Sequence, residues 1–145
     1  ERIRSAVNER NEDLFSQMAL AVHNGDVETV RALAARGFDL TSSSYDQRTP
    51  LHLAAIEGHT TVVRTLCDLG ADVAARDRFG ASPIRNAVDA HHGQVADELS
   101  KFGGRLDLER PAARLHAAAK GGDMETMTML VAHGVDINAA NYDGR

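Results

Sequence analysis

Residues 48–77, RTPLHLAAIEGHTTVVRTLCDLGADVAARD, contain two short apolar segments with helical spacing, and each segment has its own start and stop signals. Thr49 and Pro50 open the first segment, because a hydroxyl side chain can cap a helix and proline suits the first helical position. Gly58 separates the two segments. Gly70 closes the second, since glycine adopts the left-handed conformation that ends many helices. The stretch therefore predicts two consecutive helices.

The same arrangement recurs along the chain. A glycine follows the second segment of each unit at Gly37, Gly70, Gly103 and Gly134, which gives spacings of 33, 33 and 31 residues. The first segment of each unit carries a small residue at an equivalent position, where it lets neighbouring helices approach closely. These residues are Ala21, Ala54, Ala87 and Ala118. Self-similarity at this period is typical of a solenoid, in which stacked units share one core.

Helix start signals recur with the same regularity. Ser82 and Pro83 repeat the hydroxyl-proline pair, while Asp26 and Asp123 stand where each can cap a second helix. Between the units lie turn-like stretches such as AARDRFGAS, with Gly80 at the tip. We expect these stretches to project as loops or short hairpins.

The motif Thr49-Pro50-Leu51-His52, set in a period of 33 residues with two helices per unit, resembles the ankyrin-repeat signature. The resemblance covers residues 13–145 and implies an all-α solenoid of antiparallel helix pairs with projecting loops or short β-hairpins. The expected repeats are about 13–43, 44–76, 77–109 and 110–140, with residues 141–145 starting a fifth. We therefore expect a longer array. Residues 1–12 are charged and match no repeat, so they are interpreted as a helical lead-in or linker; the second helix of a degenerate upstream repeat is the alternative.

Two units depart from this pattern. The first has Ser16-Gln17 in place of Thr-Pro, so its first helix is expected to begin earlier, near Asn11 or Asp13. The fourth is two residues short of the period and has Ala113-Arg114 where Thr-Pro would fall. We predict a helix that starts near Pro111, preceded by a reduced hairpin.

Composition excludes several classes of function. The chain is 43% hydrophobic and 26% charged with a net charge of −5, which gives no electrostatic support for binding nucleic acid or an anionic membrane. No apolar run approaches the roughly 20 residues that span a bilayer. Cys67 is the only cysteine, which excludes an internal disulfide and points to a reducing compartment. We expect an intracellular protein, in the cytoplasm.

No catalytic, metal or cofactor site is expected in this segment. By resemblance, the imidazoles of His52 and His116 bond to the threonine of their repeat and to the backbone of the next loop, although the fourth unit lacks that threonine. His91 and His92 would point about 100° apart on a helix, and no third ligand is spaced nearby. Cys67 falls at a usually apolar position and is interpreted as core.

Three acids near the end of the second unit are interpreted as solvated surface groups and caps, without paired acid-base geometry. They are Asp68, Asp72 and Asp77. Several glycines are present, but none forms a phosphate-cradling loop after a strand.

Binding is the remaining function, and the partner is expected to be another protein or a peptide rather than a small molecule. In ankyrin proteins the hairpin tips and the exposed side of each first helix form the binding surface. Carried over to this chain, these positions are Tyr45, Asp46, Arg48, Ile56, Glu57, Arg78, Phe79, Asp89, Ala90, His23, Asn24, Lys120, Tyr142, Asp143 and Arg145. Tyr45 and Phe79 are loop aromatics flanked by arginines, a composition typical of binding hot spots. The alternative, that each ring packs on its own loop, stays open.

A more local likeness concerns the host protein. The stretches LFSQMALAVHNGDVETVRALAARGFDL, YDQRTPLHLAAIEGHTTVV and DRFGASPIRNAVDAHHGQV resemble the ankyrin tail of animal-type glutaminases and of some cytosolic asparaginases. The fourth unit and the start of a fifth exceed a short glutaminase tail. An accessory domain of such an amidohydrolase is therefore an alternative to a free-standing scaffold, and the cytosolic array of a channel is a third option. No amidase active-site residues occur in this segment.

Overall fold

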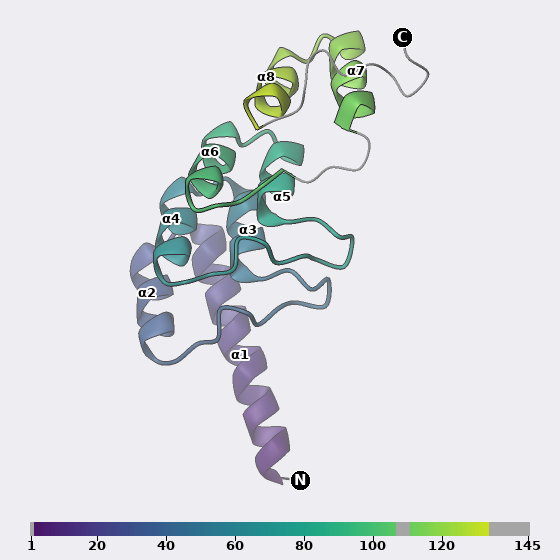
Figure 1. Cartoon of the computed structure of the whole chain (residues 1–145). Coiled ribbons are helices and arrows are strands. Elements are labelled where there is room, and N and C mark those ends of the chain that lie inside the picture. The colour runs from purple at the N-terminus through teal and green to yellow at the C-terminus, as the bar shows by residue number, and fades with distance from the viewer. Residues whose placement is uncertain (1, 107–110, 134–145) are drawn as a thin grey trace.

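The computed structural model describes the backbone of residues 2–106 and 111–133, and the side chains of residues 13–106 and 113–133 (Figure 1). Within these ranges the chain forms helices joined by loops and has no β-strand. The predicted all-α class is thus confirmed. The helices are α1 (Arg2–Asn24), α2 (Val27–Ala35), α3 (Pro50–Glu57), α4 (Thr60–Asp68), α5 (Pro83–Asp89), α6 (Gly93–Lys101), α7 (Pro111–Gly121) and α8 (Met124–Ala132).

The helices pair in chain order and the pairs stack. α1, α3 and α5 pack side by side as an inner layer, and α2, α4 and α6 pack side by side as an outer layer (Figure 1). The loops that connect successive pairs project away from the stack as two long excursions before α3 and before α5. This is the solenoid of helix pairs that the repeat period predicts.

Side-chain caps explain where α2, α3 and α5 begin. The side chains of Thr49 and Ser82 accept hydrogen bonds from the backbone amides of His52 and Arg85, and a proline follows each cap. Asp26 caps α2 by accepting hydrogen bonds from the hydroxyl and the amide of Thr29, and these two bonds hold the pKa of Asp26 below its ordinary value. Each cap satisfies an amide that the first turn of a helix leaves without an internal partner.

The shared core lies between the two layers. Equivalent leucines of the four outer helices are buried: Leu33, Leu66, Leu99 and Leu130. The equivalent alanines of the inner helices are buried as well: Ala21, Ala54, Ala87 and Ala118. Because each layer is made by neighbouring units, no single helix pair could bury these side chains alone.

The projecting loops close with hairpin-like hydrogen bonds but form no strands. The amide of Ser44 donates to the carbonyl of Arg48 (3.0 Å), and the amide of Asp77 donates to the carbonyl of Ala81 (2.9 Å). Gln47 and Gly80 occupy the same position of the two turns with φ of 60° and 75°. Glycine takes this backbone conformation at little cost, whereas glutamine does not.

Helix α1 corrects one prediction. It begins at Arg2, rather than near Asn11 or Asp13, and continues to Asn24 without interruption. Residues 2–24 contain no proline and no glycine, so nothing in the sequence stops a helix there. The boundary proposed between residues 12 and 13 therefore falls inside a continuous helix.

The fourth helix pair stands apart from the others. α7 begins at Pro111, as its sequence predicts. α8 packs on α7 and contacts α5, but α7 makes little contact with α5, and α8 makes little with α6 (Figure 1). The predicted reduced hairpin before α7 and the start of a fifth unit lie outside the described residues.

Candidate partner-binding surface

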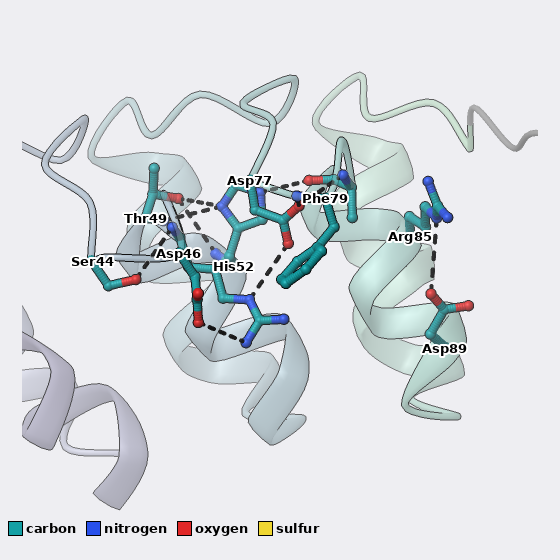
Figure 2. Close-up of polar contacts among 10 residues, drawn as sticks. Ser44, Asp46, Thr49, His52, Asp77, Phe79, Arg85 and Asp89 are labelled. Atoms are coloured by element: carbon teal, nitrogen blue, oxygen red, sulfur yellow. Dashed lines mark hydrogen bonds and ion pairs between the residues drawn. The ribbon is translucent and has the colours of Figure 1, made fainter.

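A buried polar network connects the two projecting loops to α3 (Figure 2). The amide of Thr49 donates to His52 Nδ1 (3.1 Å), and the other ring nitrogen of His52, Nε2, lies 2.9 Å from the carbonyl oxygen of Ala81 in the next loop. Burial lowers the pKa of His52, so the neutral ring donates from Nε2 and accepts at Nδ1. This is the geometry that the ankyrin resemblance implies for His52.

Asp77 joins this network, and its predicted role is wrong. Its side chain is buried, rather than solvated, and accepts hydrogen bonds from the amides of Phe79 and Ala81 (both 2.9 Å). Arg48 Nε lies 3.4 Å from the second carboxylate oxygen of Asp77, Oδ2. Burial raises the pKa of Asp77, but these hydrogen bonds outweigh burial and hold that pKa below its ordinary value. Only the tight turn of the chain over residues 77–81 could bring both amides to one carboxylate.

The two loop aromatics are exposed to solvent, and each ring stacks against an arginine of the neighbouring loop. Arg78 lies over the ring of Tyr45 (5.3 Å to the ring centre), and Arg48 lies over the ring of Phe79 (5.8 Å). Tyr45 is 86% exposed and Phe79 is 65% exposed. A hydrogen bond from the amide of Arg78 to the carbonyl of Asp46 (2.8 Å) joins the loops beneath them. The rings contact arginines across the loops, and both keep most of their surface exposed.

A second group of predicted residues gathers at the far ends of the inner helices. His23 Nδ1, at the end of α1, lies 3.1 Å from a carboxylate oxygen of Glu57, at the end of α3. Asp89, at the end of α5, pairs with Arg114 of α7 (2.6 Å) and lies 3.9 Å from Arg85 Nε. The remaining members are exposed or half-buried: Asn24, Ile56, Ala90 and Lys120.

The structure therefore divides the predicted surface into two patches. The loop-tip patch consists of Tyr45, Asp46, Arg48, Arg78 and Phe79. The helix-end patch consists of His23, Asn24, Ile56, Glu57, Asp89, Ala90 and Lys120. Because α3 begins beside the loops and runs to Glu57, the patches lie at opposite ends of the inner helices, about 12 Å apart for eight helical residues (Figure 1). Tyr142, Asp143 and Arg145 lie outside the described residues.

Comparison with known proteins agrees with this architecture. A family model described as ankyrin repeats (3 copies) matches residues 4–77, about half of the chain, and one described as ankyrin repeats (many copies) matches residues 115–145. The chain belongs to the ankyrin-repeat family. Ankyrin repeats are non-catalytic modules that typically bind other proteins.

Relatives with this ankyrin segment belong to different kinds of protein. The chain is 33% identical over 134 residues to an L-asparaginase of Dirofilaria immitis, covering 90% of this chain and 23% of the asparaginase. It is 34% identical over 103 residues to the mitochondrial glutaminase liver isoform of Rattus norvegicus, covering 69% of this chain and 17% of that protein. It is 38% identical over 71 residues to the potassium channel SKOR of Arabidopsis thaliana, covering 49% of this chain and 9% of the channel. The chain spans less than a quarter of the length of each of these relatives.

The sequence interpretation missed two contacts between the helix-connecting turns of successive ankyrin repeats. Nε2 of His59 lies 2.8 Å from the carbonyl of His23, and Nε2 of His92 lies 3.0 Å from the carbonyl of Ile56. The two rings occupy the same repeat position, one residue after Gly58 and His91. Lining up the repeats could have revealed this pair.

The histidine pair at residues 91 and 92 lies in a turn, so the expectation that both are on a helix is wrong. His91 adopts a φ of 62°, at the position that Gly58 fills in the preceding ankyrin repeat, and Nδ1 of His91 lies 3.2 Å from Thr126 Oγ1. The segment turns here because α5 has already ended at Asp89. Within residues 2–106 and 111–133, no group of three or more His, Cys, Asp or Glu residues could hold a metal ion.

Other positions differ between the ankyrin repeats. Arg85 stands where His52 stands in the preceding repeat, and its buried Nε has no hydrogen-bond partner. His116 also occupies this position, but its side chain is exposed. Cys67 lies in the core, and burial raises its pKa to about 11, so the thiol stays protonated at neutral pH. None of the helices in the described ranges is both long and apolar enough to cross a membrane.

Proposed function

We propose that this ankyrin segment binds another protein or a peptide through the loop-tip patch and the helix-end patch, without catalysis of its own. The observation that carries the proposal is the pair of exposed rings, Tyr45 and Phe79, each held by an arginine of the neighbouring loop. Tyrosine and arginine are enriched among the residues that contribute most to binding. Because the loops are joined by hydrogen bonds before a partner arrives, binding costs little further ordering.

The arrangement suits an elongated partner. Two patches about 12 Å apart along the inner helices favour an extended peptide or a helix over a small molecule. The net charge of −5 gives no support for nucleic acid or an anionic membrane as the partner. The proposal needs no cofactor, and the single cysteine favours a reducing intracellular compartment such as the cytoplasm.

The test is affinity capture with the present chain, followed by measurement of the affinity for each captured protein. We expect Tyr45→Ala, Arg78→Ala and Phe79→Ala each to weaken binding by roughly tenfold or more, as expected for hot-spot side chains. Arg31→Ala, on the exposed outer face of α2, is the matched control and should leave the affinity unchanged. Capture that is indifferent to all three loop changes would reject this surface.

The second candidate is an accessory domain of a glutaminase- or asparaginase-type amidohydrolase. It is favoured by the match of 90% of this chain to a minor part of an L-asparaginase. In such a protein this segment would aid assembly or recruit a partner. Two measurements test it: hydrolysis of glutamine or asparagine by the full-length protein, and the oligomeric state of that protein with and without the ankyrin segment. Lack of both hydrolytic activities would exclude this candidate.

A further inference from the structure

The outer layer of helices is open between α6 and α8. A groove of about 370 Å³ lies there, lined by Gly93 and Asp97 of α6 and by Met124, Glu125, Met129 and His133 of α8 and its end. The volume is near the lower end of the roughly 300–1,000 Å³ that ligand sites occupy. This groove is on the opposite layer from the inner helices that carry the helix-end patch (Figure 1). We name it the α6–α8 groove.

The repeat positions explain why this groove exists. Between α4 and α6, Arg64 Nη2 pairs with Glu98 Oε1 at 3.0 Å and bridges the two helices. One step along the stack, the same two positions hold Asp97 and Met129, which cannot form an ion pair. The first residue of α6 is Gly93, which offers no side chain to fill the space. The outer layer is therefore closed between α4 and α6 and open between α6 and α8.

The walls of the groove combine apolar surface with negative charge. Met124 is 68% exposed, and Met129 lies deeper in the groove. Methionine side chains are flexible and polarizable, so they adapt to different apolar partners. Asp97 on one wall is 65% exposed, and Glu125 on the other wall is exposed too. No lysine or arginine is among the described residues that line the groove.

One of the residues that line the groove, His133, also carries a buried polar atom. The side chain of His133 is only 5% exposed, and its Nε2 has no hydrogen-bond partner. Nε2 lies 3.2 Å from Asp97 Oδ1 without the alignment of a hydrogen bond. A buried polar group without a partner is costly. An ammonium or guanidinium group entering here can donate to the exposed carboxylate of Asp97.

We propose that the α6–α8 groove binds an amphipathic helix of another protein, with apolar side chains on the methionines and lysine or arginine side chains beside Asp97 and Glu125. The charge of the walls selects a basic partner. The groove lies between two helices whose backbone groups are bonded internally, and the described residues offer no sheet edge for an extended chain. A helix laid into an apolar groove is the recognition mode that remains. This surface is separate from the loop-tip and helix-end patches, so both can be occupied together.

The chain offers a direct reporter, because it contains four methionines and three of them lie on α8. The probe is a synthetic helical peptide with leucines along one face and lysines elsewhere. The chain is labelled at its methionine methyl carbons and titrated while its NMR spectrum is recorded. We expect the methyl signals of Met124 and Met129 to shift and saturate. The signal of Met18, fully buried in α1, should stay in place.

A peptide of the same composition with its leucines scattered around the helix should bind roughly tenfold more weakly, because it cannot bury them together. If neither peptide shifts Met124 and Met129, or if both shift them equally, the proposal is overturned. It is overturned as well if these signals move with protein concentration alone, since a second copy of the chain then occupies the groove.

Two variants separate groove binding from general attraction to an acidic protein. Gly93→Met should fill the groove and weaken peptide binding by roughly tenfold. The helix should tolerate the change, because a Cβ at Gly93 would lie 3.5 Å from Met129 Sδ, an ordinary contact. Asp97→Lys should weaken binding and reduce its salt dependence.

Arg31→Glu, at the same repeat position on α2, adds negative charge away from the groove and should leave the affinity within about twofold. Circular dichroism checks that each variant keeps its helices. If Arg31→Glu raises the affinity for the peptide and Gly93→Met leaves it unchanged, the binding is due to net charge and the groove is rejected as the site.

Discussion

The second and third helix pairs, α3–α6, and the fourth pair, α7–α8, bury equivalent alanines and leucines but pack differently. Between α3 and α5, His52 reaches across to the carbonyl of Ala81 and ties one unit to the next. In the following unit Arg85 takes the place of His52, and its buried Nε makes no hydrogen bond. A matching apolar face is therefore not sufficient for tight stacking. The residues that bridge one unit to the next are needed as well.

The fourth unit also has a smaller side chain than the second unit at an equivalent position. Leu53 packs against the core of the second unit, whereas Ala117 stands at that position in α7 and is exposed. A cleft of about 420 Å³ lies between α5, α7 and α8, with Val88, Ala117 and Leu130 among its lining residues. The Asp89–Arg114 ion pair crosses this cleft. The fourth pair is thus held to the stack by fewer and more polar contacts.

The largest expected contrast is between two equivalent buried leucines. Leu66→Ala in α4 should lower the free energy of unfolding by about 2–5 kcal/mol, because closely packed neighbours surround the cavity it leaves. Leu130→Ala in α8 should cost less and should unfold α7–α8 before the rest, since Leu130 already borders the open cleft. Urea unfolding followed by circular dichroism gives the free energies, and hydrogen exchange locates the unfolding. Equal losses in a single transition would remove the distinction between the two regions.

The next contrast concerns the histidine position. His52→Ala should cost roughly 1–3 kcal/mol, because the amide of Thr49 and the carbonyl of Ala81 lose a buried partner. His116→Ala, at the same position on the exposed side of α7, is the matched control and should change the free energy of unfolding by less than about 0.5 kcal/mol. Urea midpoints of the two variants check this. A comparable loss in both would mean that His116 also bridges units.

Acidification should destabilise the fold through the buried ring of His52. The pKa of His52 lies below its ordinary value of 6.5 because the ring is buried. As pH falls below 6.5, the unfolded chain takes up a proton that the folded chain does not bind, so stability falls until the pKa of the folded state is reached. Between about pH 7.5 and 5.5, wild type should therefore lose more stability than His52→Gln. Urea unfolding at both pH values measures the two losses of stability. Equal losses in wild type and variant would show that groups other than His52 cause the pH dependence.

The smallest expected effect is a gain. Ala117→Leu restores the side chain of Leu53 to the fourth unit, and burying its methyl groups in the cleft should raise the stability of α7–α8 by about 1 kcal/mol. Ala113→Leu, also on α7 and exposed but outside the residues that line the cleft, is the control. Slower hydrogen exchange in α7 and α8 is the readout. No change in exchange would mean that the volume of Ala117 is not what opens the cleft.

Much of the fold followed from the sequence, because its signals are local. The caps at Thr49 and Ser82 and the prolines after them act through the first turn of each helix, so spacing alone places them. The start of α1 was misjudged because the sequence up to Asp13 contains neither a stop nor a start signal of comparable strength. Asp77 was misjudged because its two amide donors come from the turn that follows it and its third donor, Arg48, comes from the neighbouring loop.

The candidate surface was predictable as a set of positions but not as an arrangement. The repeat pattern pointed to Tyr45 and Phe79 separately. That each ring lies against an arginine of the other loop depends on how far apart stacking sets the loops. The α6–α8 groove was not predicted at all, because it arises from the positions of Asp97 and Met129 in adjacent repeats, and neither residue is unusual within its own helix.

The sequence by itself determined the repeat period, the helix pairs, their caps and the shared apolar face, since each depends on residues within one turn or one period of one another. Tertiary structure decided how tightly successive units close, which acid is buried, and where the outer layer leaves a groove. These properties depend on contacts between residues about 30 positions apart, such as the Arg64–Glu98 ion pair and the contact of the His52 ring with the backbone carbonyl of Ala81. Their contact energies exist only after the units have stacked.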